Sequence, residues 1–456
     1  PPSASVPTPG AMTGRLPEPE TAGQSPRFVI GSVVASAFLV GFGGGVVFPI
    51  FPTLGAVLGI SPVLVGVVLS ANRFSRLVSN PVAGVIVDSY GTRIPFVAGL
   101  GVQTLATTGY VVAVGAPAPG LWFLGARILH GVGSALVFAT SYTIIANVTT
   151  EESRGTSMGL IRGGSILGFP TGLVLGGIVS ELAGNTEAFL FAAVFAMVAT
   201  VLAFFTVPET HEPTGANQPA EEDSAAERTQ LLGVPAIDTS VPTLSLGLVN
   251  FGLWFSYLGL MFASLVLFLE TKEIAAFGFG PQGSSGIFMG MTIVVEVCFM
   301  TLGGYITDQR PSRVPTLTLF VVLFTAGLAV LPWADSARLL GGVCLLIGVG
   351  AGGTLGPLMA LLADFTPEDR MGRASGTINI FSDIGGGLGP IISLPLIDAL
   401  GFVPVYTGAA GFPLFAGVAL VTGLYVSTGE LFPKTGSSSE PAEPLPTEPE
   451  VSDSNS

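Results

Sequence analysis

The 456-residue chain is 49% hydrophobic and only 10% charged, and its mean hydropathy is +0.72. A soluble chain of this length needs far more charge on its surface, so lipid is the expected solvent for most of it. The net charge of −14 comes from acids in polar segments at the two ends and in the middle of the chain, and no basic patch accompanies them. We therefore expect no nucleic-acid partner.

Apolar runs of about 20 residues, the length needed to cross a bilayer, divide the rest of the chain. Residues 1–27 are rich in proline, serine and threonine and predict a disordered N-terminal tail. The range 28–207 holds six candidate spans: 28–50, 62–87, 94–115, 121–148, 158–182 and 188–207. A predicted cytoplasmic central loop at 208–243 follows. The range 244–425 holds six more: 244–269, 285–307, 314–331, 339–363, 374–397 and 406–425. The acidic tail at 426–456 is also expected to be disordered.

The distribution of Lys and Arg predicts the orientation. If the N-terminus is cytoplasmic, ten basic residues fall in inner segments and only Lys272 and Arg338 fall in outer loops. We therefore expect a multi-pass protein of the plasma membrane with both termini and the central loop in the cytoplasm.

The two halves of the chain look like repeats of each other. Gly131 and Gly133 in the fourth span match Gly348 and Gly350 in the tenth, a shift of 217 residues. Repeats of this kind are common in transporter folds. At the same shift, six further residues coincide: Thr149, Glu151, Gly155, Gly159, Gly168 and Gly172 fall on Thr366, Glu368, Gly372, Gly376, Gly385 and Gly389. The predicted fold class is an all-α membrane protein whose twelve transmembrane helices form two pseudo-symmetric six-helix bundles.

The loop between the second and third spans carries a Gly-x-x-x-Asp-x-x-Gly-x-Arg pattern: Gly84, Asp88, Gly91 and Arg93. The first glycine permits close helix contact, the second permits a tight turn, and Arg93 is a cation in reach of Asp88. The pattern resembles the signature loop of the major facilitator superfamily. This resemblance implies two bundles that rock about a midplane site and a loop that gates the inner side.

The equivalent loop of the second half is a degenerate copy of this motif. Asp308 and Arg313 occupy the acid and arginine positions, and Pro311 replaces the second glycine. We assign Asp308 and Arg313 to the same predicted gating motif.

The fourth span contains Arg127 and His130 one turn apart. This segment resembles the conserved fourth-helix motif of the superfamily, in which the arginine is associated with proton coupling. Snorkelling of Arg127 to the outer interface is the alternative. His130 is either a packed histidine or a titratable relay group.

Glycines four residues apart recur in the fifth and eleventh spans, where they let helices approach closely. The series in the fifth span resembles the antiporter motif of drug:proton exchangers, although Leu173 stands where that family has proline. Packing alone is the alternative explanation. The predicted helix-packing motif comprises Gly168, Gly172, Gly176, Gly177, Gly385, Gly389 and Pro390.

Charged residues inside the spans are the sharpest indication of a site, because each costs about 3 kcal/mol at mid-membrane. Arg73 and Arg76 lie on one face of the second span, and Glu296 and Asp383 lie at similar depth in the eighth and eleventh. Either an acid carries the coupling proton beside the arginines, or the charges only pair across the two halves. We favour the first explanation for at least one acid, and Glu296 over Asp383. Arg162 reads as an interfacial residue.

These patterns predict a secondary active transporter, not an enzyme, since the two histidines, His130 and His211, cannot assemble a catalytic cluster. We expect a monomer that uses alternating access and has no cofactor or metal. The expected activity is proton-coupled efflux of drug-like or amphipathic molecules. The alternative is an organic anion or other metabolite, favoured by the cationic second span and the absence of an acid in the first. A non-transporting sensor is a third reading.

Overall fold

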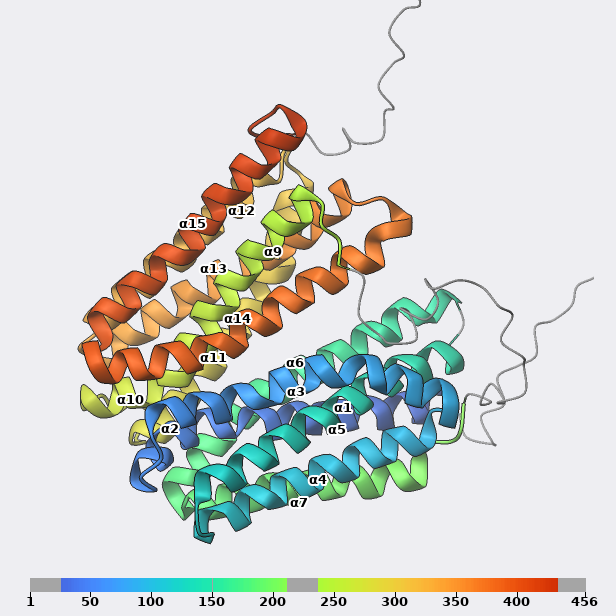
Figure 1. The fold of residues 1–456 in the computed structure, drawn as a ribbon, viewed down its shortest axis with the longest axis vertical. Helices are drawn as coiled ribbons and strands as arrows, with labels where there is room; N and C mark the ends of the chain where they lie inside the picture. The colour runs from blue at the N-terminus through green and yellow to red at the C-terminus, as the bar shows by residue number, and fades with distance from the viewer. Residues whose placement is uncertain (1–25, 150, 211–236, 434–456) are drawn as a thin grey trace, which may run out of the picture.

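The computed structural model describes residues 26–149, 151–210 and 237–433 (Figure 1). Most of both predicted tails and of the predicted central loop lies outside these residues. In the described part of the chain every regular element is a helix, and the only β-pairing is an isolated bridge between Ala276 and Phe279.

The described helices form two bundles that follow each other along the chain (Figure 1). The first bundle contains α1 (Pro26–Gly45), α2 (Val47–Val57), α3 (Pro62–Tyr90), α4 (Arg93–Gly115), α5 (Pro119–Val148), α6 (Glu151–Ala183) and α7 (Asn185–Thr206). The second contains α9 (Val241–Trp254), η1 (Phe255–Phe262), α10 (Ala263–Thr271), α11 (Pro281–Asp308), α12 (Val314–Val330), η2 (Leu331–Trp333), α13 (Ala337–Phe365), η3 (Glu368–Arg370), α14 (Met371–Leu400) and α15 (Phe402–Thr428).

Eleven of the described helical segments are long and apolar enough to cross a membrane. The segments α1–α2 and α9–η1–α10 each count as one. The twelfth long helix is α3, which has 29 residues and includes Arg73, Arg76 and Asp88. A helix of this length is about 43 Å long and exceeds the hydrocarbon thickness. The structure is thus an all-α membrane fold.

Several helices extend beyond the apolar runs. α9 begins at Val241, inside the range expected for the central loop, and α15 continues to Thr428, inside the expected tail. An apolar run marks only the part of a helix that lies in hydrocarbon, whereas a helix ends where its backbone groups find other partners. Ser61 and Ser336 provide such partners, because their hydroxyls accept hydrogen bonds from the backbone N–H of Leu64 and Leu339.

Small residues set the spacing between the first and fifth helices of each bundle. At Gly168 and Gly172 of α6 a Cβ would collide with the carbonyl oxygens of Phe38 and Phe42 on α1. In the second bundle Gly385 faces the Phe251 carbonyl, and the next glycine of that row contacts η1. The same packing therefore occurs in both halves.

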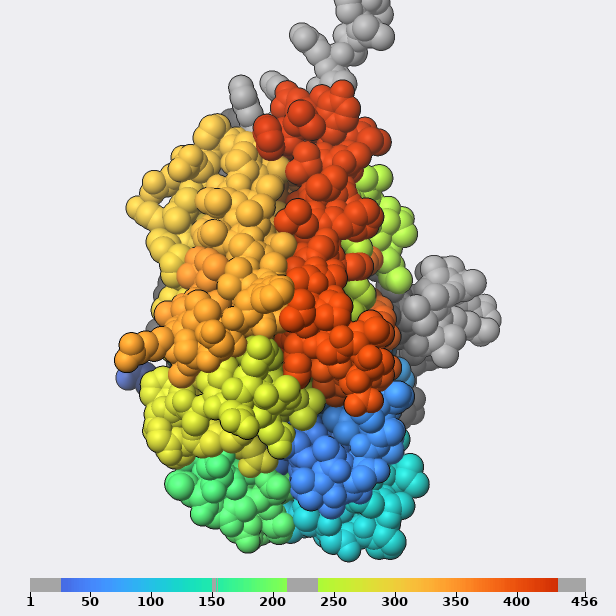
Figure 2. Space-filling model, turned by 90° about the vertical axis from the view of Figure 1, so that its left-hand side faces the viewer, coloured from blue at the N-terminus to red at the C-terminus, as the bar shows by residue number. Residues whose placement is uncertain are grey.

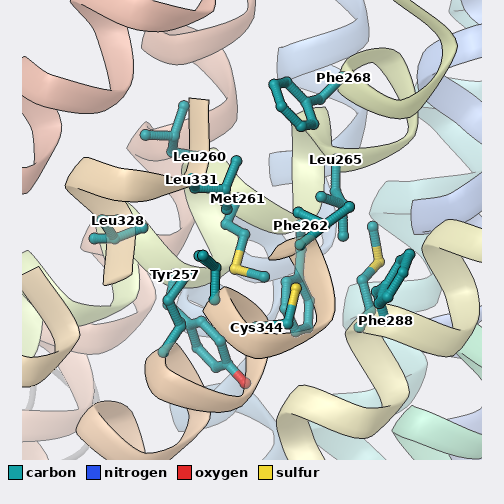
Figure 3. Close-up of a cluster of buried hydrophobic side chains, with 14 of the residues drawn as sticks. Tyr257, Leu260, Met261, Phe262, Leu265, Phe268, Phe288, Leu328, Leu331 and Cys344 are labelled. Atoms are coloured by element: carbon teal, nitrogen blue, oxygen red, sulfur yellow. The ribbon is translucent and has the colours of Figure 1, made fainter. Parts of the chain in front are cut away.

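The second bundle has the largest apolar core, and an unusual turn of helix runs through it (Figure 3). η1 is a π-helix between α9 and α10, and it supplies Tyr257, Met261 and Phe262 to this core. π-helical turns inside long helices are rare and often mark functional positions. The Tyr257 ring is buried among these residues, and its hydroxyl points out of the cluster.

The bundles meet along two helix pairs, α3 with α14 and α6 with α11. They also meet at one end of the molecule, where α2 contacts α10 and α11. We call this end the closed end. Figure 2 faces it and shows α10 and the segment after it seated directly on α2 and on the turn between α6 and α7. The bundles diverge toward the opposite end, which holds the α3–α4 and α11–α12 loops and which we call the loop end (Figure 1).

Candidate functional site

A cavity of about 350 Å³ lies between the two bundles and is lined by charged and aromatic side chains. We call it the central cavity. It receives Arg73 and Arg76 from α3, Arg162 from α6, Glu296 from α11 and Asp383 from α14. The apolar part of its wall includes Phe169, Trp254, Phe262, Ile293 and Leu355. The structure therefore gathers the four predicted charged residues, from three helices of both halves, around one space, and adds Arg162 from a fourth helix.

Asp383 bridges the two bundles by accepting hydrogen bonds from both arginines of α3. Its Oδ1 lies 2.5 Å from Arg76 Nη2 and 3.2 Å from Arg73 Nη1. Arg73 also lies over the Trp254 ring, 5.4 Å from its centroid. Gly386 makes this approach possible, because a Cβ there would lie 3.0 Å from the Arg73 guanidinium carbon. For Asp383 the geometry matches pairing across the halves.

Glu296 has a different partner. Its Oε2 accepts a hydrogen bond of 2.8 Å from the Tyr257 hydroxyl, and among the described residues no cation lies within ion-pair distance of it. The Tyr257 hydroxyl can donate to a carboxylate or accept from a carboxylic acid. The environment of Glu296 thus accommodates both the charged and the neutral form of the acid.

Arg127 is buried inside the first bundle, so it does not snorkel to an interface. Its guanidinium donates to the carbonyl oxygens of Val68 and Leu69 and to the Asn72 side-chain oxygen, at 2.9 to 3.2 Å. No carboxylate of the described chain forms an ion pair with it. His130 is also buried, and its Nδ1 has no hydrogen-bond partner in the described part of the chain.

Arg162 is an exposed residue of α6 at the central cavity. We expected it at the membrane interface, but it lines the central cavity and, within the described ranges, forms no ion pair or hydrogen bond. Its position about one turn into the fifth predicted span fits both locations. It adds a third cation to the site.

The α3–α4 loop shows a second difference from expectation, because Arg93 does not contact Asp88. Arg93 donates to the Phe204 carbonyl oxygen at 3.0 Å and lies over the Phe204 ring. Glu209 instead binds the loop, accepting from the Thr92 backbone N–H at 2.7 Å and the Thr92 hydroxyl at 2.8 Å. Asp88 is exposed at the end of α3 and, in the described residues, has no ion-pair partner. Gly84 has open space around it.

The equivalent loop of the second bundle does contain an ion-pair cluster. Arg313 donates to Asp308 at 2.5 Å and to Asp364, at the end of α13, at 2.7 Å. Partial burial acts to lower the pKa of Arg313, but the two carboxylates outweigh it and raise the pKa above its ordinary value. The cluster ties α11, α12 and α13 together at the loop end.

Sequence reasoning missed Trp254, Tyr257 and Glu209. A weak signal for the first two existed, since both bring a polar hydrogen-bonding group into an apolar span and they lie three residues apart, on one helical face. Glu209 gave no signal, because it stands in a polar segment without periodicity.

Comparison with known proteins agrees with this architecture. The family model described as Major Facilitator Superfamily matches residues 33–390. Multidrug resistance protein 1 of Bacillus subtilis is 25% identical over 395 residues, which cover 86% of this chain and 93% of that protein.

Two solved structures share the fold at low sequence identity. A bacterial homologue of the human lysosomal transporter Spinster, in an inward-facing and occupied conformation, aligns with a TM-score of 0.69 and 14% identity over 90% of this chain and 98% of its own. The human organic anion transporter MFSD10 (TETRAN) aligns with a TM-score of 0.60 and 18% identity over 87% of this chain and 100% of its own. Because the family match spans most of the chain, this protein belongs to the Major Facilitator Superfamily and is a multi-pass membrane transporter of small molecules, not an enzyme.

Proposed function

We propose that this transporter exports amphipathic compounds in exchange for protons, by alternating access to the central cavity. The observation that carries the proposal is the environment of Glu296. This acid lines the cavity, has no cationic partner in the described chain and bonds to a hydroxyl that accommodates both of its protonation states. A coupling group must pass between these two states in every cycle.

The predicted orientation and the closed end support a specific step of the cycle. With both termini in the cytoplasm, the loop end is the inner end and the closed end faces outward. We assign this conformation to the inward-facing state of a monomer in the plasma membrane. The two loop motifs, with Asp88 and Arg93 in one and Asp308 and Arg313 in the other, then lie where an inner gate must form. The glycine rows that bring α6 against α1 and α14 against α9 are the proposed helix-packing motif.

The relatives favour efflux over uptake. Multidrug resistance protein 1 of Bacillus subtilis aligns along most of both chains, and its name refers to drug resistance, which export of a drug would produce. The apolar and aromatic wall of the central cavity suits compounds with a large apolar body.

Glu296→Gln tests the proposal in proteoliposomes that hold a fluorescent amphipathic compound inside. We expect the variant to lose movement driven by a pH gradient while it still exchanges substrate between equal pools. Glu270→Gln, an exposed acid at the end of α10, is the matched control and should behave like the unmodified protein. Full pH-driven transport by Glu296→Gln would remove this acid from the coupling mechanism. Substrate binding without flux in the unmodified protein would favour a sensor.

A further inference from the structure

A second cavity of about 160 Å³ opens beside the central cavity, inside the first bundle. We call it the side pocket. It shares Arg73, Arg76, Ser165 and Phe169 with the central cavity, so the two spaces adjoin. Its remaining wall comes from α1, α3 and α5, with Phe48 of α2 and Leu258 of η1. Among the described residues, the only charged ones that line the side pocket are two arginines, whereas the central cavity also contains Glu296 and Asp383 and has most of the apolar wall.

Two residues of the side-pocket wall carry a buried polar atom that has no hydrogen-bond partner in the described part of the chain: His130 Nδ1 and Ser165 Oγ. The His130 side chain is only 2% exposed. Buried polar groups are nearly always paired with protein, water or ligand, and an unpaired one costs about 1–3 kcal/mol. Asn72 adds hydrogen-bond donors to the pocket wall. Its side-chain oxygen accepts from Arg127, so the N–H groups of its amide are left to bind a ligand.

The charges around the side pocket have one sign. Arg73 and Arg76 line it, and Arg127 lies behind Asn72 without a carboxylate partner in the described chain. No acid is among the lining residues. Asp383 reaches the first two arginines from the other bundle and offsets one charge. An anionic group in the side pocket would therefore meet at least one uncompensated cation and several hydrogen-bond donors.

We propose that the side pocket binds the anionic head group of an amphipathic organic anion, such as a carboxylate or sulfonate, whose apolar body lies in the central cavity against Trp254, Phe262 and Ile293. This inference rests on the proposed use of the central cavity as the transport site and names the class of its substrate. The anionic end would lie beside arginines with no acid in the described pocket wall, and the apolar end would lie against the aromatic and aliphatic part of the central cavity.

The test compares two probes that differ only in the head group, 1-pyrenebutyrate and 1-pyrenebutanol. The full chain is placed in phosphatidylcholine nanodiscs with no pH gradient, and Trp122 and Trp333 are replaced by Phe so that energy transfer to pyrene reports on Trp254 alone. We expect the anion to bind at least about tenfold more tightly than the alcohol, as charge-assisted hydrogen bonds imply. Equal affinities would overturn the proposal.

Ser165→Ala locates the head group. The Ser165 hydroxyl has no partner in the described chain, so its removal breaks no internal bond. We expect the variant to bind pyrenebutyrate several-fold more weakly and to bind pyrenebutanol with unchanged affinity. Ser141→Ala is the control, because the Ser141 hydroxyl is buried elsewhere on α5 and bonds to the Val137 carbonyl oxygen. If Ser165→Ala lowers both affinities equally, or neither, the head group lies elsewhere.

Gly44→Ala tests the space itself. A Cβ at Gly44 would lie 3.8 Å from His130 Nε2 and from the Phe169 ring, ordinary contact distances that allow folding while filling part of the pocket. Gly31→Ala, on the same helix with open space around it, is the control. We expect only Gly44→Ala to lower the affinity for pyrenebutyrate. Equal affinities for the two variants would count against the site.

An anionic lipid head group shares the chemistry of the proposed substrate, so one arm adds phosphatidylglycerol to the nanodiscs. Unchanged pyrenebutyrate affinity supports a free organic anion, whereas competition assigns the pocket to lipid and overturns the proposal. Because binding is measured without a gradient, the result is independent of whether Glu296 couples transport to protons.

Discussion

At the scale of single residues, the two acids of the central cavity occupy different environments although they lie at similar depth. Asp383 accepts from two guanidinium groups of the opposite bundle, while Glu296 accepts from a tyrosine of its own bundle. A carboxylate that pairs with two cations is costly to protonate, because a proton would leave both cations without a counter-charge. The pairing of Asp383 therefore favours a structural role for it and leaves Glu296 as the coupling candidate.

Asp383→Asn should therefore destabilise the folded protein, by up to about 3 kcal/mol since the cavity admits some water. Glu296→Gln should change stability by less than about 1 kcal/mol, because an amide can still bond to Tyr257. Thermal unfolding in detergent measures both. Adding Arg76→Gln to Asp383→Asn should restore part of the loss by removing one unpaired cation. A larger loss for Glu296→Gln than for Asp383→Asn would reverse the two assignments.

At the scale of helices, Glu209 replaces the contact that the sequence led us to expect in the α3–α4 loop. Its carboxylate accepts from the backbone N–H groups of Thr92 and Arg93, at 2.7 and 3.1 Å, and so caps the N-terminus of α4. Gly91 permits this cap in two ways: its φ of 78° belongs to the left-handed region, and a Cβ would lie 2.8 Å from the Glu209 carboxylate. Gly91, the second glycine of the motif, is therefore needed for the turn between α3 and α4 and also for the contact with Glu209, which follows α7.

We expect Glu209→Ala to lower the melting temperature by about 1–2 °C, because a helix N-terminus loses about 1–2 kcal/mol without a capping acceptor. Glu209→Gln should lose less, since its amide oxygen can still accept. Glu430→Ala, an exposed acid after α15, is the control and should leave the melting temperature unchanged. Equal melting temperatures for all three variants would show that the cap does not stabilise α4.

The sequence predicted the number and order of the long helices, because runs of about 20 apolar residues leave few alternatives in a bilayer. It could not predict the π-helix at η1, since Phe255–Phe262 has no feature that distinguishes it from an α-helical segment. Of the site, Arg73, Arg76, Glu296 and Asp383 were identifiable as charges in apolar runs. Their pairing was not, because it depends on how α3 and α14 are rotated about their axes.

At the scale of the whole molecule, a single residue of the second bundle holds much of the closed end together. Gln282, in the first turn of α11, donates to Thr53 and Asn185 at 3.0 and 3.2 Å and accepts from the Ser180 hydroxyl at 2.7 Å. All three partners belong to the first bundle. Beside them Glu181 accepts from the Gly283 backbone N–H at 3.4 Å, across the same boundary. These bonds must break before the closed end can open.

Gln282→Ala should therefore shift the equilibrium toward the state in which the closed end is open. At about 1 kcal/mol for each of the three bonds lost, the ratio of the two states changes by roughly a hundredfold. Spin labels at Pro117 and Asp335 report on the closed end, and labels at Ser89 and Gln309 report on the loop end, in a chain whose Cys298 and Cys344 are replaced by Ala. We expect the first distance to lengthen and the second to shorten. Thr271→Ala is the control, because Thr271 is exposed at the same end and bonds only within its own helix.

Since the two bundles are joined at mid-depth by Asp383 and its arginines, opening one end without closing the other would require that ion pair to break. If Gln282→Ala lengthens the closed-end distance while the loop-end distance stays constant, the bundles do not rock as rigid bodies, and the cycle must instead proceed through bending of individual helices.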